Sequence, residues 1–413
     1  MSKRLRLPDK GMKVIKDLFL SVLAYALSAV ALTFVVQPAM SRIVDDEVYG
    51  RFLTLLSVIR LLVGVFITSL ANLRMLRERD YAQKGVKGDF NFQLLLSMAL
   101  SSVILIVVLY IYQSRSILEY VLCIITMLLI MVHDYFSVYY RVVIQYSKLV
   151  LDNILIVVGY GIGLLIYYFV TPVWQIVIIG GYVCGTLYVL FTSPYCRETA
   201  KRTPLYGETL KKHGQMSTSM LLRDSINYCD RLLIYPILGG GQVSIYSAAS
   251  VVGKVIQLVS TPVQRVLLSY IVRRNTVDKK DLKKVLLLSV PLFVVAYAGL
   301  YLVGRILLPI MYPQYAEAAA GILWIILMAI IFNTVAAMFN TILMRFDKMS
   351  IQIWIPLARL VCYLSCALPL VGAFGLMGFC WGYLTSAVVF LGFTVVRLFM
   401  ISGKTNEQKA EQQ

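Results

Sequence analysis

Long apolar segments follow one another along the chain, and they limit the possible folds more than any other feature. Each is about 20 residues long, the length a helix needs to cross a bilayer. The twelve segments lie at roughly 18–37, 52–73, 92–112, 117–139, 150–170, 174–193, 217–237, 243–268, 285–310, 318–343, 351–371 and 376–400. The sequence therefore predicts an all-α integral membrane protein with about twelve transmembrane helices.

The composition leaves little room for a soluble domain. Of 413 residues, 59% are hydrophobic and only 15% are charged, whereas a soluble domain carries roughly 25% charged residues. Twelve spans use nearly all of the apolar residues, which excludes a large catalytic domain outside the membrane. The sequence also has no phosphate-binding glycine motif. We therefore expect no catalytic residues, no enzyme activity and no cofactor.

The charge balance reports how the chain is oriented. There are 39 Lys and Arg against 21 Asp and Glu, a net charge of +18, which in a soluble protein would suggest a nucleic acid partner. Here the basic residues gather in every second loop, and the other loops contain only Arg42, Arg51 and Arg115. The positive-inside rule then places both termini in the cytoplasm and requires an even number of spans. We expect membrane lipid, and not nucleic acid, around this protein.

The two halves of the chain contain a weak internal repeat. Three pairs recur at nearly constant offsets: Tyr49 and Tyr246 at 197, Lys148 and Lys348 at 200, and Tyr182 and Tyr383 at 201. Because six spans are an even number, both halves have the same orientation and the repeat is parallel. This predicts a six-helix lobe at 1–193, a cytoplasmic linker at 194–216 and a second six-helix lobe at 217–413, around a central cleft.

Three parts of the sequence together resemble a known family. They are QPAMSR and EVYGRF at 37–42 and 47–52, DRLLI and VSIYSAA at 230–234 and 243–249, and MYPQYAEAA at 311–319. These patterns are similar to those of Wzx-type polysaccharide flippases in the multidrug/oligosaccharidyl-lipid/polysaccharide exporter superfamily, and the resemblance covers almost the whole chain.

The resemblance implies a function and a location. A protein of this type moves an undecaprenyl-pyrophosphate-linked sugar repeat unit across the bacterial inner (plasma) membrane by alternating access. It supplies surface polysaccharide such as O-antigen or capsule, beside polysaccharide polymerase and export proteins. The implied partner is therefore a lipid-linked anionic oligosaccharide.

Some charged residues fall inside the predicted spans, where each costs at least ~2.5–3.5 kcal/mol and should face the protein interior or a wet cleft. Cations suit an anionic substrate because arginine forks bind phosphate. The candidate substrate-binding residues of a cationic cleft are Arg60, Arg223, Arg231, Lys254, Arg265 and Arg359. The candidate charge partners or ion-coupling residues are Asp152, Asp224 and Asp230.

The seventh span is the most informative of these. Its charged residues Arg223, Asp224, Asp230 and Arg231 fall within an arc of roughly 120° on a helix, so one face is polar. This face either pairs internally within the bundle or lines the cleft and binds phosphate. Both interpretations remain open.

Arg60 in the second span has a counterpart in the second half. The repeat offset places it opposite Gln257, one helical turn from Lys254. Arg60 and Lys254 would then flank a pyrophosphate from two sides. Alternatively, either cation extends to the membrane interface or pairs with a carboxylate.

Two further assignments complete the predictions. The alternative function is a cation-coupled multidrug exporter of the same fold, which needs a protonatable carboxylate inside the first lobe, and Asp152 is the best candidate. We expect no metal site, because His133 and His213 lie far in sequence from Cys362 and Cys366. The seven cysteines are expected to be structural or to face lipid.

Overall fold

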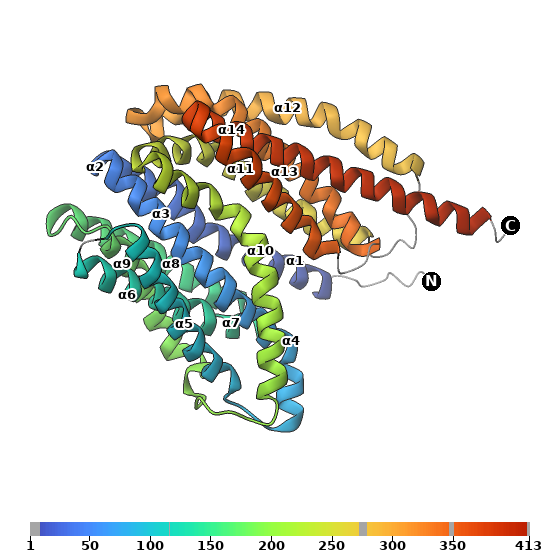
Figure 1. The fold of residues 1–413 in the computed structure, drawn as a ribbon. Coiled ribbons are helices and arrows are strands. Elements are labelled where there is room, and N and C mark those ends of the chain that lie inside the picture. The colour runs from blue at the N-terminus through green and yellow to red at the C-terminus, as the bar shows by residue number, and fades with distance from the viewer. Residues whose placement is uncertain (1–8, 115, 272–278, 347–350, 411–413) are drawn as a thin grey trace, which may run out of the picture. The chain divides into compact units, whose positions relative to one another are not determined.

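The structure is a computed structural model that describes residues 9–410 except 115, 272–278 and 347–350. These described residues form helices, with no strand among them. The chain divides into two compact units, which we describe separately (Figure 1). The first unit comprises Met1–Met40 and Leu55–Asp224, and the second comprises Ser41–Thr54 and Ser225–Gln413.

The first unit contains most of the N-terminal half. Its helices begin with α1 (Asp9–Val30), the π-helical η1 (Ala31–Val36), α2 (Gln37–Ile43), α3 (Asp46–Leu62), the π-helical η2 (Val63–Thr68) and α4 (Ser69–Lys84). They continue with α5 (Asp89–Ile111), α6 (Ile117–Phe136), α7 (Val138–Val142), α8 (Tyr146–Phe169), α9 (Gln175–Thr192), the 3₁₀ turn η3 (Pro194–Arg197) and the first half of α10 (Tyr206–Leu238). Part of α2 and part of α3 belong to the second unit. Within this unit α8 packs along α1 and α9.

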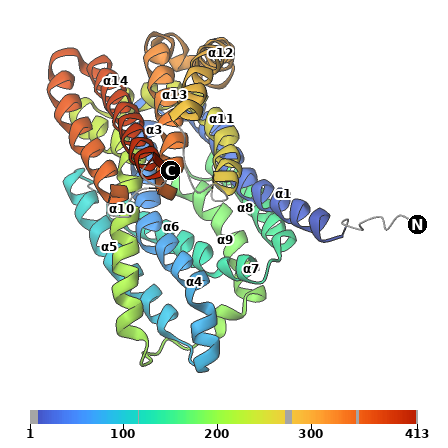
Figure 2. The ribbon, with the colours of Figure 1, turned by 90° about the vertical axis from the view of Figure 1, so that its right-hand side faces the viewer.

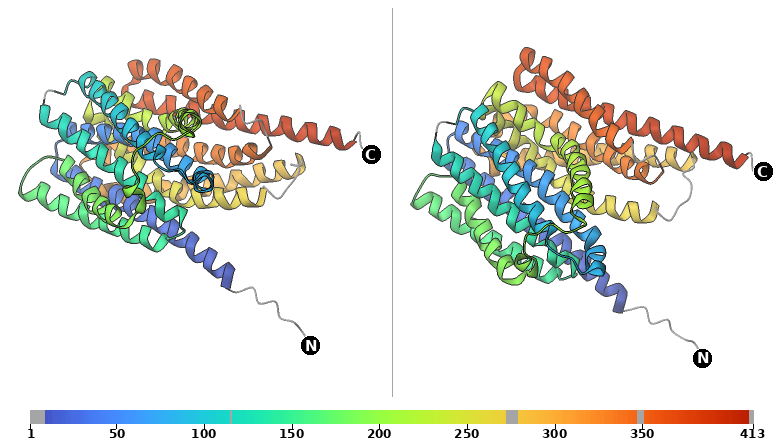
Figure 3. Two further views of the ribbon diagram at one scale, coloured as in Figure 1. Left: turned by 90° about the horizontal axis from the view of Figure 1, so that it is seen from below. Right: turned by 60° about the horizontal axis from the view of Figure 1, so that its bottom comes forward.

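The second unit is built from the longer C-terminal helices. They are the second half of α10, then α11 (Gly240–Ile271), α12 (Lys279–Met311), the 3₁₀ turn η4 (Pro313–Tyr315), α13 (Ala316–Phe346) and α14 (Ile351–Ala410). The chain turns at Gly375 in α14, where φ is +56°, a value that favours glycine. The 60 residues of α14 are therefore two helices, which run beside α13 (Figure 3).

The helices agree with the predicted spans. Nine helical stretches within the described residues are long and apolar enough to cross a membrane. One of them, Trp354–Ile401, contains the turn at Gly375 and so covers the last two predicted spans. The predicted spans at 217–237 and 243–268 lie on α10 and α11. The prediction of an all-α integral membrane protein is confirmed, and the protein is a multi-pass membrane protein.

The borders of the two units differ from the predicted lobes. The expected linker at 194–216, together with 217–224, belongs to the first unit, and 41–54 belongs to the second. The organisation into six-helix lobes around a central cleft stays a prediction. Contacts inside each unit explain both differences.

The linker is fixed to the first unit by buried charged residues. Arg74 of α4 donates two hydrogen bonds of 2.8 Å to the Glu198 carboxylate, and its guanidinium lies 3.9 Å from the ring centre of Tyr195. Arg77, one turn further, donates to Thr209 at 2.7 Å and to Glu208 at 2.8 Å. The start of α10 consequently runs beside α4 (Figures 1 and 2). Bidentate pairs of this kind give geometric specificity, so the linker is part of the first unit.

Segment 41–54 is held in the second unit through the start of α11. The Glu47 carboxylate accepts hydrogen bonds from the backbone N–H groups of Gly240 at 2.8 Å and Gly241 at 3.1 Å. A negative charge is favourable at a helix N-terminus. The Ser244 hydroxyl also donates to the Asp46 carbonyl at 2.8 Å. Two glycines of the turn at Gly239–Gly241 thus bind the side chain of Glu47.

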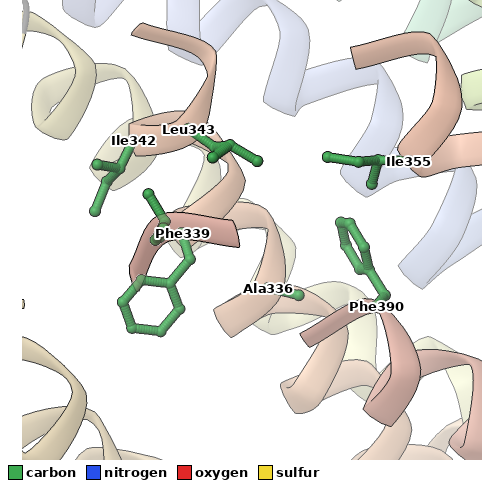
Figure 4. Packing of buried hydrophobic residues seen from close by; sticks show 7 residues of the cluster. Ala336, Phe339, Ile342, Leu343, Ile355 and Phe390 are labelled. Atoms are coloured by element: carbon green, nitrogen blue, oxygen red, sulfur yellow. The ribbon is translucent and has the colours of Figure 1, made fainter. Parts of the chain in front are cut away.

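An apolar cluster fixes α13 against both halves of α14. Leu343 and Ile355 point toward each other, and the Phe390 ring extends from the second half of α14 toward Ile355 (Figure 4). All three side chains are buried. Their packing holds the C-terminal helices of the second unit together.

Gly50 lies where α3 and α11 approach each other closely within the second unit. A Cβ added there would overlap the backbone of Gly240, so we expect Gly50→Ala to lower the free energy of unfolding by about 1–3 kcal/mol. Gly299 on α12 is a matched control, since an added Cβ there meets nothing within 4 Å. Thermal unfolding of both purified variants measures the difference, and equal midpoints would contradict the packing.

His213 gives the linker a predictable pH response. Its Nε2 lies 2.9 Å from the Phe66 carbonyl of η2, and burial lowers the pKa of the ring below its ordinary value of 6.5. As the pH falls below 6.5, the unfolded chain binds a proton that the folded chain does not, so stability decreases. Between pH 7.5 and 5.5, we expect the thermal unfolding midpoint of His213→Gln to fall less than that of the parent protein. Parallel pH profiles would show that His213 does not contribute.

Candidate functional site

Arg60 is half-buried in the first unit, beside two tyrosines. Its guanidinium carbon is 5.3 Å from the ring centre of Tyr182 on α9, and Arg60 also interacts electrostatically with Tyr160 on α8. Both tyrosines are almost fully buried. Asp134 of α6 interacts with the same two tyrosines, so a cation and a carboxylate share one aromatic wall.

His133 connects this wall to the predicted residue Asp152. Its Nδ1 lies 2.9 Å from Asp134 Oδ1, and its Nε2 lies 2.9 Å from Asp152 Oδ2. The Asp152 side chain is fully buried, and the His133 ring packs edge-on against Tyr182. A histidine that donates to both carboxylates carries a proton on each ring nitrogen. We call His133, Asp134 and Asp152 the histidine cluster.

His133 was not among the site residues predicted from the sequence, although its position within the fourth predicted span indicated a contact with Asp152. His133 lies near the C-terminal end of the fourth predicted span and Asp152 near the N-terminal end of the fifth. Consecutive spans run in opposite directions, so these two residues are at the same depth in the membrane. Their equal depth in consecutive spans would have predicted that the two side chains contact each other.

Arg223 and Asp224 form a separate pair in the first unit. Arg223 Nε donates to Asp224 Oδ1 at 3.1 Å, and the Arg223 side chain is 60% exposed. Asp224 lies next to Gly64 in η2, where a Cβ would be 2.8 Å from its Oδ2. Asp230 and Arg231, further along the same helix, belong to the second unit.

The second unit brings Asp230, Arg231 and Lys254 together. Asp230 of α10 interacts with Arg231, with Lys254 of α11 and with the Tyr246 hydroxyl. Lys254 in turn interacts with Arg231, which repels it, and with Asp230, which attracts it. Arg231 is only 9% exposed. Two cations thus share one carboxylate inside the second unit.

Arg359 of α14 joins these residues through tyrosines. It interacts with Tyr363 and Tyr383, and both of these tyrosines also interact with Asp230. Its guanidinium carbon lies 4.7 Å from the ring centre of Phe390, which is a cation–π contact. We define the cationic cluster as Asp230, Arg231, Lys254 and Arg359 with Tyr246, Tyr363 and Tyr383.

Other predictions have different outcomes. Arg265 and Gln257 are in α11, and both side chains lie outside the described residues. Arg60 and Lys254, expected to flank one anion, belong to different units. All seven cysteines are free thiols. Among the described residues no three His, Cys, Asp or Glu side chains are placed to hold a metal ion.

Comparisons with solved structures identify the fold. An inward-facing multidrug resistance MATE family transporter of the MOP superfamily matches with a TM-score of 0.58 and 13% identity, over 96% of this chain and 99% of that one. Lipid II flippase MurJ in an inward closed conformation matches with a TM-score of 0.62 and 14% identity, over 95% and 90% of the two chains. This chain has their fold. No family model and no curated protein matches the sequence.

A third structure supports the same fold. An outward-facing conformation of a multidrug resistance MATE family transporter matches with a TM-score of 0.58 and 12% identity, over 97% of this chain and 98% of that one. All three neighbours are described as transporters or flippases.

Asp152 is expected to be a structural requirement of the first unit. Asp152→Asn removes the charge that compensates His133 in a fully buried position, so we expect a loss of about 3 kcal/mol in the free energy of unfolding. Asp80→Asn is a matched control, because Asp80 is 54% exposed beside Arg77 and such pairs contribute roughly 0–1 kcal/mol. Unfolding of both variants in detergent measures the contrast, and a loss no larger than that of Asp80→Asn would contradict it.

Proposed function

We propose that this protein is a flippase that moves a lipid-linked anionic oligosaccharide across the bacterial inner membrane by alternating access. The proposed substrate is an undecaprenyl-pyrophosphate-linked repeat unit of a surface polysaccharide. The observation that carries the proposal is a set of half-buried cations in a fold that a lipid II flippase also has. Arg60 and Arg359 interact with tyrosines, and Lys254 interacts with Arg231 and Asp230. A cation inside a membrane protein costs free energy unless it pairs with an anion.

The chemistry of these side chains fits such a substrate. Guanidinium groups donate two parallel hydrogen bonds to a phosphate, and a lysine ammonium adds a compact charge. Tyrosine hydroxyls hydrogen-bond to sugar, and tyrosine faces pack against it. The polyprenyl tail would stay in the bilayer during transport. We further propose that both termini are cytoplasmic, and that polysaccharide polymerase and export proteins act beside the flippase.

A second candidate function is a cation-coupled multidrug exporter. The histidine cluster favours it, because Asp152 is a fully buried carboxylate in the first unit and His133 contacts it directly. The MATE neighbours with the same fold are multidrug transporters. Against this, the cationic cluster would repel the cationic drugs that such exporters remove.

Translocation in cells distinguishes the two functions. In a strain that lacks this protein, we expect lipid-linked repeat units to accumulate on the cytoplasmic leaflet while drug susceptibility stays unchanged. Lys254→Ala should reduce translocation at least about tenfold, because it removes a cation that contacts the anion. Arg305→Ala is the matched control, since Arg305 is exposed on α12 of the same unit. Drug sensitisation with intact surface polysaccharide would favour the exporter instead.

A further inference from the structure

Arg202 is an exposed arginine that lies against two aromatic rings of the first unit. Its guanidinium carbon is 4.5 Å from the ring centre of Phe92 and 5.1 Å from that of Tyr206. The two rings also contact each other edge to face, with their centres 5.5 Å apart. A guanidinium that stacks on a ring keeps the N–H groups along its edge for hydrogen bonds to another partner.

The backbone beside Arg202 is fixed by a buried carboxylate. Asp89, the first residue of α5, accepts hydrogen bonds from the backbone N–H of Thr203 at 2.6 Å and from the Tyr81 hydroxyl at 2.8 Å. Asp89 is fully buried. The fold therefore places Arg202 before any ligand binds, which lowers the entropic cost of binding.

Two lysines lie close to Arg202. Lys201 precedes it in the chain, and Lys87 is in the loop before α5; both are exposed. The two loops touch, because a Cβ on Gly88 would lie 3.0 Å from the backbone nitrogen of Lys201. In the part of the chain that the structure describes, no ion pair includes any of these three cations. We call Lys87, Lys201 and Arg202 the basic patch.

The nearby carboxylates of the linker are compensated by other arginines. Glu198 accepts two hydrogen bonds of 2.8 Å from Arg74. Glu208 accepts one of 2.8 Å from Arg77. Even with the buried Asp89 counted, the three cations of the basic patch leave a net positive charge at this end of α5. The patch therefore attracts an anion.

An exposed apolar face of α5 begins at the basic patch. Leu96, Val103 and Val107 lie on the same side of the helix as Phe92, within an arc of roughly 60°. These three aliphatic side chains are between 46% and 58% exposed. Because α5 is long and apolar enough to cross a membrane, acyl chains cover such a face. Phe92 is in the first turn of α5, so Arg202 lies at the level where a lipid headgroup meets its acyl chains.

We propose that the basic patch binds the phosphate of an anionic phospholipid, with an acyl chain along the exposed face of α5. Arg202 donates hydrogen bonds to the phosphate oxygens, and Lys87 and Lys201 add positive charge. Phe92 and Tyr206 are positioning residues, because they hold the guanidinium at the level of the headgroup. In the proposed topology this lipid belongs to the cytoplasmic leaflet. The site is distinct from the transport pathway, since its occupant is a lipid of the surrounding membrane.

Native mass spectrometry of the purified full-length protein tests the site, with phosphatidylglycerol and, separately, with phosphatidylcholine, which has no net charge. We expect the first phosphatidylglycerol to bind several-fold more tightly than phosphatidylcholine. Arg202→Gln should weaken phosphatidylglycerol binding about tenfold, because it removes charged hydrogen bonds to the phosphate. Arg79→Gln is the matched control: Arg79 is exposed on α4 of the same unit, and its loss changes the net charge equally. This control should bind phosphatidylglycerol like the parent protein.

Two further variants separate the position of the guanidinium from its charge. Phe92→Leu keeps every charge but removes a ring under Arg202, so it should weaken phosphatidylglycerol binding several-fold. Arg202→Lys keeps the charge but lacks the planar fork, so it should restore only part of the affinity. Affinity for phosphatidylcholine and the unfolding midpoint without added lipid should stay unchanged in all of these variants.

Three results would overturn the inference. Equal losses in Arg202→Gln and Arg79→Gln would show attraction by the overall charge and no site. Equal affinity of the parent protein for the two lipids would show that the headgroup charge is not recognised. Displacement of phosphatidylglycerol by an equal concentration of inorganic phosphate would assign a site for a soluble anion in place of a lipid. Selective loss in Arg202→Gln, without displacement by phosphate, supports the lipid site.

Discussion

The cost of an uncompensated charge inside a membrane protein organises this structure. Lipid offers no partner to a buried ion, so each charged side chain within a span needs a counter-charge, an aromatic face or a ligand. The first unit satisfies this requirement internally, through the contacts of His133 with Asp134 and Asp152 and through the Arg223–Asp224 pair. The second unit uses tyrosines around Arg359 and one shared carboxylate, Asp230.

The same cost explains how the connecting segments are placed. The Arg74 side chain is 5% exposed, and Glu198 compensates its charge by accepting a hydrogen bond from each of its two terminal nitrogens. That contact makes the linker part of the first unit. The Glu47 carboxylate has the corresponding role at the start of α11, where it accepts hydrogen bonds from two backbone N–H groups. In both places a charged residue contributes hydrogen bonds that hold a connecting segment within its unit.

The fold was predicted from the sequence, whereas most contacts between the charged residues were found only in the structure. Hydropathy is a local property, so it located the spans, including those on either side of Gly375. Charge pairing is a property of helices distant in sequence, so contacts such as those of His133 were found only in the structure. The repeat offset linked Arg60 with Lys254, which belong to different units, and this link stays a prediction. The depth of His133 and Asp152 within consecutive spans was readable from the sequence, but packing was needed to bring their side chains together.

The unequal division of charge is also visible in the sequence once the units are known. A net positive charge over the whole chain suggested cytoplasmic loops first and a cationic cleft second. The structure assigns the spans to units, and only then does Asp230 become the sole carboxylate within the spans of the second. Within the predicted spans, the excess of positive charge therefore belongs to the second unit, while the carboxylates outnumber Arg and Lys in the first. The proposed anionic substrate would be attracted by this excess, and not by the net charge of the chain as a whole.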